Sequence, residues 1–128
     1  MTVLPIASKD FSGRWIDDPV HRAWLAAEAR AQFAFFRRSL RPDGRFDALD
    51  LDGRPIAGLP QELHSTARLV HSYALGQLWG EPDCAAIIDA GMAFLWAGHR
   101  DADHGGYVWS VAEDGSIADG TKLAYGHV

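Results

Sequence analysis

The sequence predicts an all-α fold in which antiparallel helices pack in an α/α arrangement. Three stretches carry apolar residues at the 3- and 4-residue steps that mark one helix face. The connections between these stretches alternate between long and short, so that all the long loops would meet at one end of the helices. Helices are expected at residues 18–40, 61–79, 83–98 and from 121 onward, within a single domain 1–128.

The composition is that of an ordinary globular chain, with 48% hydrophobic and 23% charged residues. The net charge of −5 comes from 17 acidic and 12 basic residues, and no basic patch is present to neutralise phosphates. A nucleic-acid partner is therefore not expected. The five tryptophans are spread over every segment, and some of them are expected to line a sugar-type site, where a flat apolar ring packs on C–H groups.

Cysteine use and apolar runs bear on the cellular location. Cys84 is the single cysteine, so no internal disulfide forms, and its apolar surroundings predict a small core residue. The first eleven residues lack the basic start and long apolar core of a signal peptide. No apolar run reaches the ~20 residues needed to span a bilayer. We therefore expect a cytoplasmic protein without a membrane partner.

The first helix is expected to begin at Asp18 and Pro19, because an acidic residue caps free N–H groups and proline suits the first turn. Its apolar face is formed by Leu25, Ala29, Phe33, Phe36 and Leu40. Residues 41–44 end it, since proline disfavours helix in the residue before it and Asp-Gly favours a turn. The connection 45–60 follows, and its Asp-Gly turns are compatible with extended pieces or a short hairpin.

The central helix starts after Pro60 and is broken by Gly80 and Pro82, where the next helix begins at once. The apolar stripe of the central helix is Leu63, Ala67, Val70, Ala74 and Leu78. The stripe of the next helix is Cys84, Ile88, Met92 and Leu95. Both follow helical spacing, so each helix is expected to bury one face.

A second long connection, residues 99–120, is expected to hold a short β-hairpin near residues 105–118. The run 107–111 reads as a strand, Asp114-Gly115 is a hairpin turn signal, and 116–118 is the return strand. A further helix is expected to start at Thr121.

Several polar and aromatic residues fall at the end where the long loops are expected to meet. His64 and Arg68 lie in the first two turns of the central helix, while Tyr107, Trp109 and Lys122 lie on or beside the second long loop. His64 and Arg68 share a helix face with His71 or Ser72. Two interpretations of that face stay open: the polar wall of a cavity, with Arg68 bonding ligand oxygens, or a solvated face on which Arg68 pairs with a carboxylate.

The second loop contains two further motifs. His99, Asp101, Asp103 and His104 are metal-ligand types, but nothing in their spacing fixes a geometry, so no metal is expected. The two glycines of the run 104–107 mark a bulge or a close backbone approach, either of which would orient Tyr107. A simple turn beside a core aromatic explains the same run equally well.

The segments TARLVHSYALG, DADHGGYVW and KLAYGHV, in this order and spacing, resemble the N-acylglucosamine 2-epimerase superfamily. Within it they are most similar to the bacterial mannose isomerases and related sulfosugar isomerases. The similarity runs from about Phe11 to the last residue and corresponds to the N-terminal portion of such enzymes. The resemblance implies the N-terminal part of an (α/α)6 barrel, with 61–79 and the helix from Thr121 as inner helices and the other two as outer ones.

The resemblance also implies a chemistry. These enzymes isomerise or epimerise monosaccharides without metal or other cofactor, and the isomerases move a proton between C1 and C2 through a cis-enediol with histidines as acid and base. Arg68 matches the arginine that binds a substrate oxygen, and Tyr107 matches the aromatic residue at the cavity mouth. Lys122 and His127 match a motif near the site, and His64 and Trp109 complete the expected substrate-binding set.

The catalytic histidines of this family are expected beyond Val128, so the catalytic residues are unknown and the 128-residue chain alone is expected to be inactive. The exposed edge of an incomplete barrel favours association, which leaves a homo-oligomer open. Three functions are weighed: a mannose/fructose-type aldose–ketose isomerase, an N-acylglucosamine-type 2-epimerase, and a non-catalytic helical fragment that binds a sugar or a partner chain.

Overall fold

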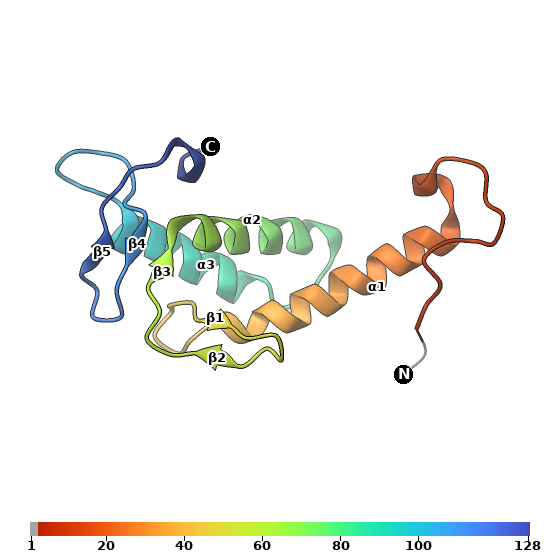
Figure 1. The fold of residues 1–128 in the computed structure, drawn as a ribbon, viewed down its shortest axis with the longest axis horizontal. Helices are drawn as coiled ribbons and strands as arrows, with labels where there is room; N and C mark the ends of the chain where they lie inside the picture. Colours follow the sequence, from red (N-terminus) through yellow and green to blue (C-terminus); the bar gives the residue numbers. More distant parts are fainter. Residues whose placement is uncertain (1–2) are drawn as a thin grey trace. The chain divides into compact units, whose positions relative to one another are not determined.

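The computed structural model describes residues 3–128, and these form two units, one running up to Phe35 and the other covering Phe36–Val128. Helices α1 (Pro19–Phe36), α2 (Leu63–Trp79) and α3 (Ala85–Phe94) supply most of the regular structure, as Figure 1 shows. Two small antiparallel sheets accompany them. The predominantly helical character is confirmed, but an all-α description leaves out these sheets.

The first unit is built around the start of α1. The carboxylate of the fully buried Asp18 accepts hydrogen bonds from the Ser8 N–H and hydroxyl, both at 2.6 Å, and from the Val20 N–H at 3.0 Å. Asp18 is thus the helix cap that the sequence predicted, and it also holds Ser8 of the preceding segment against the start of α1. Burial raises its pKa, but the Ser8 and Val20 hydrogen bonds outweigh burial and hold the pKa below its usual 3.8.

The second unit is organised around the antiparallel pair α2 and α3. Gly80 adopts the left-handed conformation (φ 99°) that ends α2, and the Glu81 N–H bonds back to the Gly76 carbonyl at 2.8 Å. Arg37, in the 3₁₀ turn Arg37–Ser39, donates to the carbonyls of Pro82 and Asp83 in the tight turn between the two helices. The short connection is therefore stabilised from outside as well as by its own backbone.

The two helices pack on a different side of α3 from the one predicted. Cys84 is buried as expected. On α3, however, Met92 is 53% exposed and Ile87 is buried, and on α2 Leu78 is 86% exposed and Tyr73 is buried. The reason is Gly91, where an added Cβ would overlap Val70 and approach the Phe46 ring. Because glycine permits this close approach, α3 turns its Ile87–Gly91 side towards α2.

Each long connection holds a hairpin. In the first, β1 (Ala48–Leu49) pairs with β2 (Pro55–Ile56). In the second, β4 (Ser110–Val111) pairs with β5 (Ile117–Asp119), which confirms the predicted hairpin near residues 105–118. The strand β3 (Gln61–Glu62) was not predicted; it adds to β4 in the sheet order β3-β4-β5. The central helix therefore begins at Leu63 and not at Gln61.

Arg45 joins the two long connections. Its guanidinium donates to the carbonyls of Val111, Ala112 and Glu113 at 2.8–3.1 Å. It also lies 4.8 Å from the centre of the Phe94 ring, at the end of α3. Arg45 thus ties the start of the first connection to the second, at the end of the helix pair where β3, β4 and β5 lie in Figure 1. The loop alternation in the sequence predicted this arrangement.

The helix ends depart from the prediction in two places. Helix α3 passes into a π-helical turn, Leu95–His99, which turns His99 into the interior. From Thr121 onward the structure has one 3₁₀ turn, Ala124–Gly126, in place of the expected longer helix. The Leu123 carbonyl, which an α-helix would pair with the His127 N–H, instead accepts from the Gly126 N–H and from Nδ1 of the His127 ring.

A buried polar network lies where α2, α3 and the second loop meet. The Thr66 hydroxyl lies 3.0 Å from Nε2 of Gln61, 2.9 Å from the Glu62 carbonyl and 3.3 Å from Nε2 of His99. Nδ1 of His99 bonds to the Val108 carbonyl at 3.0 Å. His99 and Thr66 have no exposed surface. Burial, with a further contribution from the positive charge of Arg45, lowers the pKa of His99 below its ordinary 6.5, although the Val108 hydrogen bond acts the other way.

We predict that His99 makes the free energy of unfolding depend on pH. Its pKa is lower in the folded state than in the unfolded chain, so its contribution is fully present above about pH 6.5 and is lost as the pH falls towards the folded-state pKa. His99→Gln should be less stable at neutral pH by about 1–3 kcal/mol, because it disrupts buried hydrogen bonds, and should respond less to pH. Urea unfolding between about pH 5 and pH 7.5 measures both effects.

The control for this prediction is His71→Gln, which changes an exposed histidine on α2. That variant should keep the pH dependence of the parent chain. An unchanged pH dependence in His99→Gln would show that the buried ring is not the titrating group.

Candidate functional site

The residues expected to bind substrate lie at the end of α2 and α3 where the long connections meet. These residues are His64, Arg68, Tyr107, Trp109, Lys122 and His127. The structure brings them together through side-chain contacts between α2, the loop that follows His99 and the segment 122–127. His71, on the same helix face as His64 and Arg68, lies about one turn beyond Arg68 on α2 and is exposed.

His64 and Trp109 form a flat aromatic surface. Their rings are stacked with centroids 4.9 Å apart and an interplanar angle of 9°. The backbone sets this contact, because the Leu63 N–H donates to the Trp109 carbonyl at 2.7 Å at the point where β3 ends and α2 begins. Nδ1 of His64 lies 3.5 Å from the Glu62 carboxylate, beyond a good hydrogen bond, and is otherwise buried without a partner. The Glu62 carboxylate is therefore the polar group beside this buried nitrogen.

Arg68 and Tyr125 form the second part of the site. The guanidinium donates a hydrogen bond to the Tyr125 hydroxyl and lies 5.4 Å from the centre of its ring. The Tyr125 ring is also 6.1 Å from that of His64. Both Arg68 and Tyr125 are exposed, so a permanent positive charge and a hydroxyl face solvent beside the aromatic surface. Of the partners considered from the sequence, a carboxylate was one; in the structure Arg68 bonds to the phenol hydroxyl of Tyr125.

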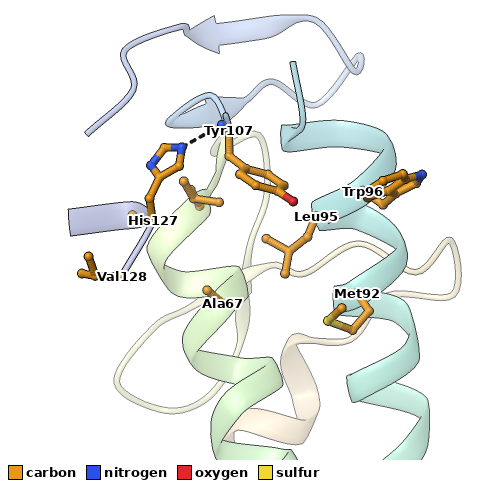
Figure 2. Close-up of a pocket in the computed structure, with 9 residues that line it drawn as sticks. Ala67, Met92, Leu95, Trp96, Tyr107, His127 and Val128 are labelled. Atoms are coloured by element: carbon orange, nitrogen blue, oxygen red, sulfur yellow. Dashed lines mark hydrogen bonds between the residues drawn. The ribbon is translucent and has the colours of Figure 1, made fainter. Parts of the chain in front are cut away.

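A pocket of about 270 Å³ is lined by two of the six residues, Tyr107 and His127, and Figure 2 shows the side chains around it. Ala67 of α2 faces Met92 of α3 and Leu95 of the π-helical turn across it, and the Tyr107 ring projects towards Leu95. The pocket is lined by Leu63, Ala67, Met92, Leu95, Trp96, Tyr107, Gly126, His127 and Val128. Its wall is mostly apolar, with the Tyr107 hydroxyl and the His127 ring as polar groups.

Lys122 and His127 hold the second loop in place. Nζ of Lys122 lies 2.7 Å from the Asp101 carboxylate, and Nε2 of His127 accepts the Tyr107 N–H at 2.8 Å. The Lys122 hydrogen bond and charge, with the His104 and Asp103 N–H groups, hold the pKa of Asp101 well below its usual 3.8. The carboxylate is therefore ionised throughout the neutral range, and the ion pair persists there.

The histidines and aspartates considered as metal ligands have other partners. His99 is buried in the polar network, Asp101 binds Lys122, and the His104 side chain is 80% exposed. Within residues 3–128 no group of three or more His, Cys, Asp or Glu side chains is placed to hold a metal ion. Among the same residues, no helix combines the length and apolarity needed to cross a membrane.

Comparison with known proteins identifies the family. Residues 44–128 match the family model described as N-acylglucosamine 2-epimerase (GlcNAc 2-epimerase). The chain belongs to the N-acylglucosamine 2-epimerase family. The matched region contains both long-loop hairpins, α2, α3 and all six expected binding residues. The predicted family resemblance is therefore confirmed.

Two relatives in this family are named D-mannose isomerase. The one from Pseudomonas cannabina pv. alisalensis is 37% identical over 113 residues, which are 88% of this chain and 27% of the relative. The one from Thermobifida fusca is 35% identical over 113 residues, which are 88% of this chain and 28% of the relative. The chain thus spans little more than a quarter of the length of these curated relatives.

Two residues of the site were not assigned to it from the sequence. Tyr125 lies in the segment KLAYGHV but had no role in the expected site, yet its hydroxyl is the partner of Arg68. Asp101 was considered as a metal ligand, yet it is the anchor for Lys122. The signal for Tyr125 was its place between Lys122 and His127 in one family motif. The signal for Asp101 was its place ahead of a Gly-Gly turn, where aspartate often accepts backbone N–H groups.

We predict that the Arg68–Tyr125 pair contributes little to stability. Tyr125→Phe and Arg68→Ala should each change the free energy of unfolding by no more than about 1 kcal/mol, because exposed polar pairs gain little over their hydration. Urea unfolding of both variants checks this, with the buried-site variant His99→Gln as the reference for a large effect. A loss of several kcal/mol in either variant would make the pair a structural element and would contradict its reading as a binding surface.

Proposed function

We propose that this chain is the N-terminal, sugar-binding part of an aldose–ketose isomerase of the mannose/fructose type, built on an (α/α)6 barrel. The observation that carries the proposal is the convergence of the Arg68–Tyr125 pair with the His64–Trp109 stack. The family and the D-mannose isomerase relatives support the same substrate class. In this proposal, α2 is an inner helix of the barrel and α3 an outer one.

The two parts of the site suit the two kinds of surface on a monosaccharide. The stacked rings of His64 and Trp109 offer a flat face for the C–H groups of a sugar. Arg68 and Tyr125 offer donors for its oxygens. The site thereby binds and orients the sugar.

Isomerisation moves a proton between C1 and C2 of the open-chain sugar, and removal of the C2 proton places negative charge on the carbonyl oxygen until that oxygen is protonated to the enediol. The Arg68 guanidinium is charged at every working pH, so it stabilises this oxygen whenever the sugar is bound. Acid–base groups with a pKa near neutrality must supply and remove the proton. In our proposal those groups lie outside this chain, and the residues described here bind, orient and stabilise.

The proposal is tested with the protein encoded by the complete reading frame that contains this sequence. It should convert D-mannose to a ketose, and Arg68→Ala should lower kcat/KM by about 10²-fold, the usual cost of removing one oxyanion-stabilising donor. His71→Gln, an exposed change on the same helix, should keep the parent activity. Absence of ketose from every hexose tried would contradict the isomerase proposal.

A 2-epimerase activity is the second candidate, and the family model that matches the chain favours it. The same binding surface serves either reaction, because both begin with removal of the proton at C2. Reaction in D₂O distinguishes them. An epimerase exchanges the C2 hydrogen of a free or N-acylated sugar and returns an aldose, while the isomerase releases a ketose.

A further inference from the structure

The segment 122–127 is fastened to the loop 101–107 at both of its ends. At one end Nζ of Lys122 lies 2.7 Å from Oδ2 of Asp101. At the other end Nε2 of His127 accepts the Tyr107 N–H at 2.8 Å, while its Nδ1 bonds to the Leu123 carbonyl at 2.7 Å. We call Asp101, Lys122 and His127 the latch.

The loop side of the latch is itself ordered by Asp101. Oδ1 of this carboxylate accepts the N–H groups of Asp103 and His104 at 3.1 and 3.0 Å. Oδ2 lies 2.7 Å from Nζ of Lys122 and 3.4 Å from Nδ1 of the exposed His104 ring. The backbone of Asp101 also bonds to Gly105 and Gly106, at 3.0 and 2.9 Å. One carboxylate therefore shapes the turn and anchors the segment that packs on it.

Gly106 lets the two sides come together. Its φ of +73° lies in the left-handed region, and a Cβ added there would be 3.1 Å from Nε2 of His127 and 3.3 Å from Cδ of Lys122. The close approach of the loop to both latch side chains thus depends on a residue without a side chain. This explains one of the two glycines ahead of Tyr107.

Tyr125 lies between the two fastened ends. It follows Lys122 by three residues and precedes His127 by two, and its hydroxyl receives the hydrogen bond from Arg68. The next residue, Gly126, packs closely on Leu63, at the start of α2, and on Trp109. Fixing both ends of this short segment therefore fixes where Tyr125 meets Arg68.

We propose that Asp101, Lys122 and His127 are positioning residues, which set Tyr125 against Arg68 and so orient the arginine for a sugar oxygen. The inference rests on the proposed function, and it replaces the expectation that Lys122 and His127 contact the sugar directly. Both ring nitrogens of His127 already have backbone partners, so neither is left for a ligand. Lys122 is directed to Asp101 and not to the Arg68–Tyr125 pair.

The first test uses this chain labelled with ¹⁵N. Long-range histidine spectra should show His127 neutral with its proton on Nδ1, as its two backbone partners require. In Lys122→Met and in Asp101→Asn, exchange of the Tyr107 amide should be about tenfold faster, and contacts between the Tyr125 ring and the Arg68 side chain should weaken. Asparagine keeps the acceptor for the loop N–H groups, so Asp101→Asn removes the ion pair while leaving the turn its hydrogen bonds.

The controls separate positioning from a general loss of structure. Lys122→Arg should restore both signals, because the ion pair can re-form, and the double variant Asp101→Asn/Lys122→Met should be no worse than either single change. Lys9→Met, which alters an exposed lysine in the first unit, should leave both signals unchanged. Unchanged Tyr107 exchange and unchanged Tyr125–Arg68 contacts in both latch variants would overturn the proposal.

The second test measures sugar turnover in the protein encoded by the complete reading frame. Lys122→Met and Asp101→Asn should lower kcat/KM by about tenfold, with recovery in Lys122→Arg. A fall for Lys122→Met without a fall for Asp101→Asn would indicate direct sugar contact by the lysine and overturn the latch. If the parent protein turns over no sugar, the proposed function fails, while the exchange measurements on this chain still decide whether the latch holds Tyr125.

Discussion

The arrangement of the site depends on the buried hydrogen bonds of Thr66 and His99. Thr66 lies on α2, His99 ends the π-helical turn after α3, and the Val108 carbonyl that His99 binds belongs to the second long connection. These hydrogen bonds form only when all three segments are correctly placed. A buried polar group left without a partner costs about 1–3 kcal/mol, so other placements are disfavoured. The network therefore fixes the loop end of the helix pair, where the site lies.

The site follows from that placement. Once Val108 is fixed, the neighbouring Trp109 carbonyl receives the Leu63 N–H, β4 pairs with β3, and the Trp109 ring lies on His64. Arg68 stands two residues after Thr66, on the exposed side of the same helix. The rigid interior of the helix thus presents a charged group at its surface, and the exposed segment 122–127 supplies its hydroxyl partner. The buried network and the proposed binding surface thus lie on different faces of α2.

The sequence predicted much of this fold through periodicity and loop length. Both depend only on the local chain, which is why α2, α3 and the second hairpin were predicted. The side of α3 that packs on α2 was not predicted correctly, because Met92 and Ile87 are both apolar and only the close approach at Gly91 selects between them. His99 was not predicted to be a core residue, because it stands in a polar run. The π-helical turn that buries it has no signal in the sequence. Tyr125 was missed for a related reason, since its partner lies 57 residues away in the sequence.

The central claim is that the first turns of α2 and the second long connection form one sugar-binding surface around Arg68. Titration of the ¹⁵N-labelled chain with D-mannose, followed through amide and side-chain shifts, tests it most directly. The account predicts saturable shifts at Arg68, Trp109 and Tyr125 and at their immediate neighbours. Saturable shifts confined to other parts of the chain, or none at these three residues at any mannose concentration, would contradict it.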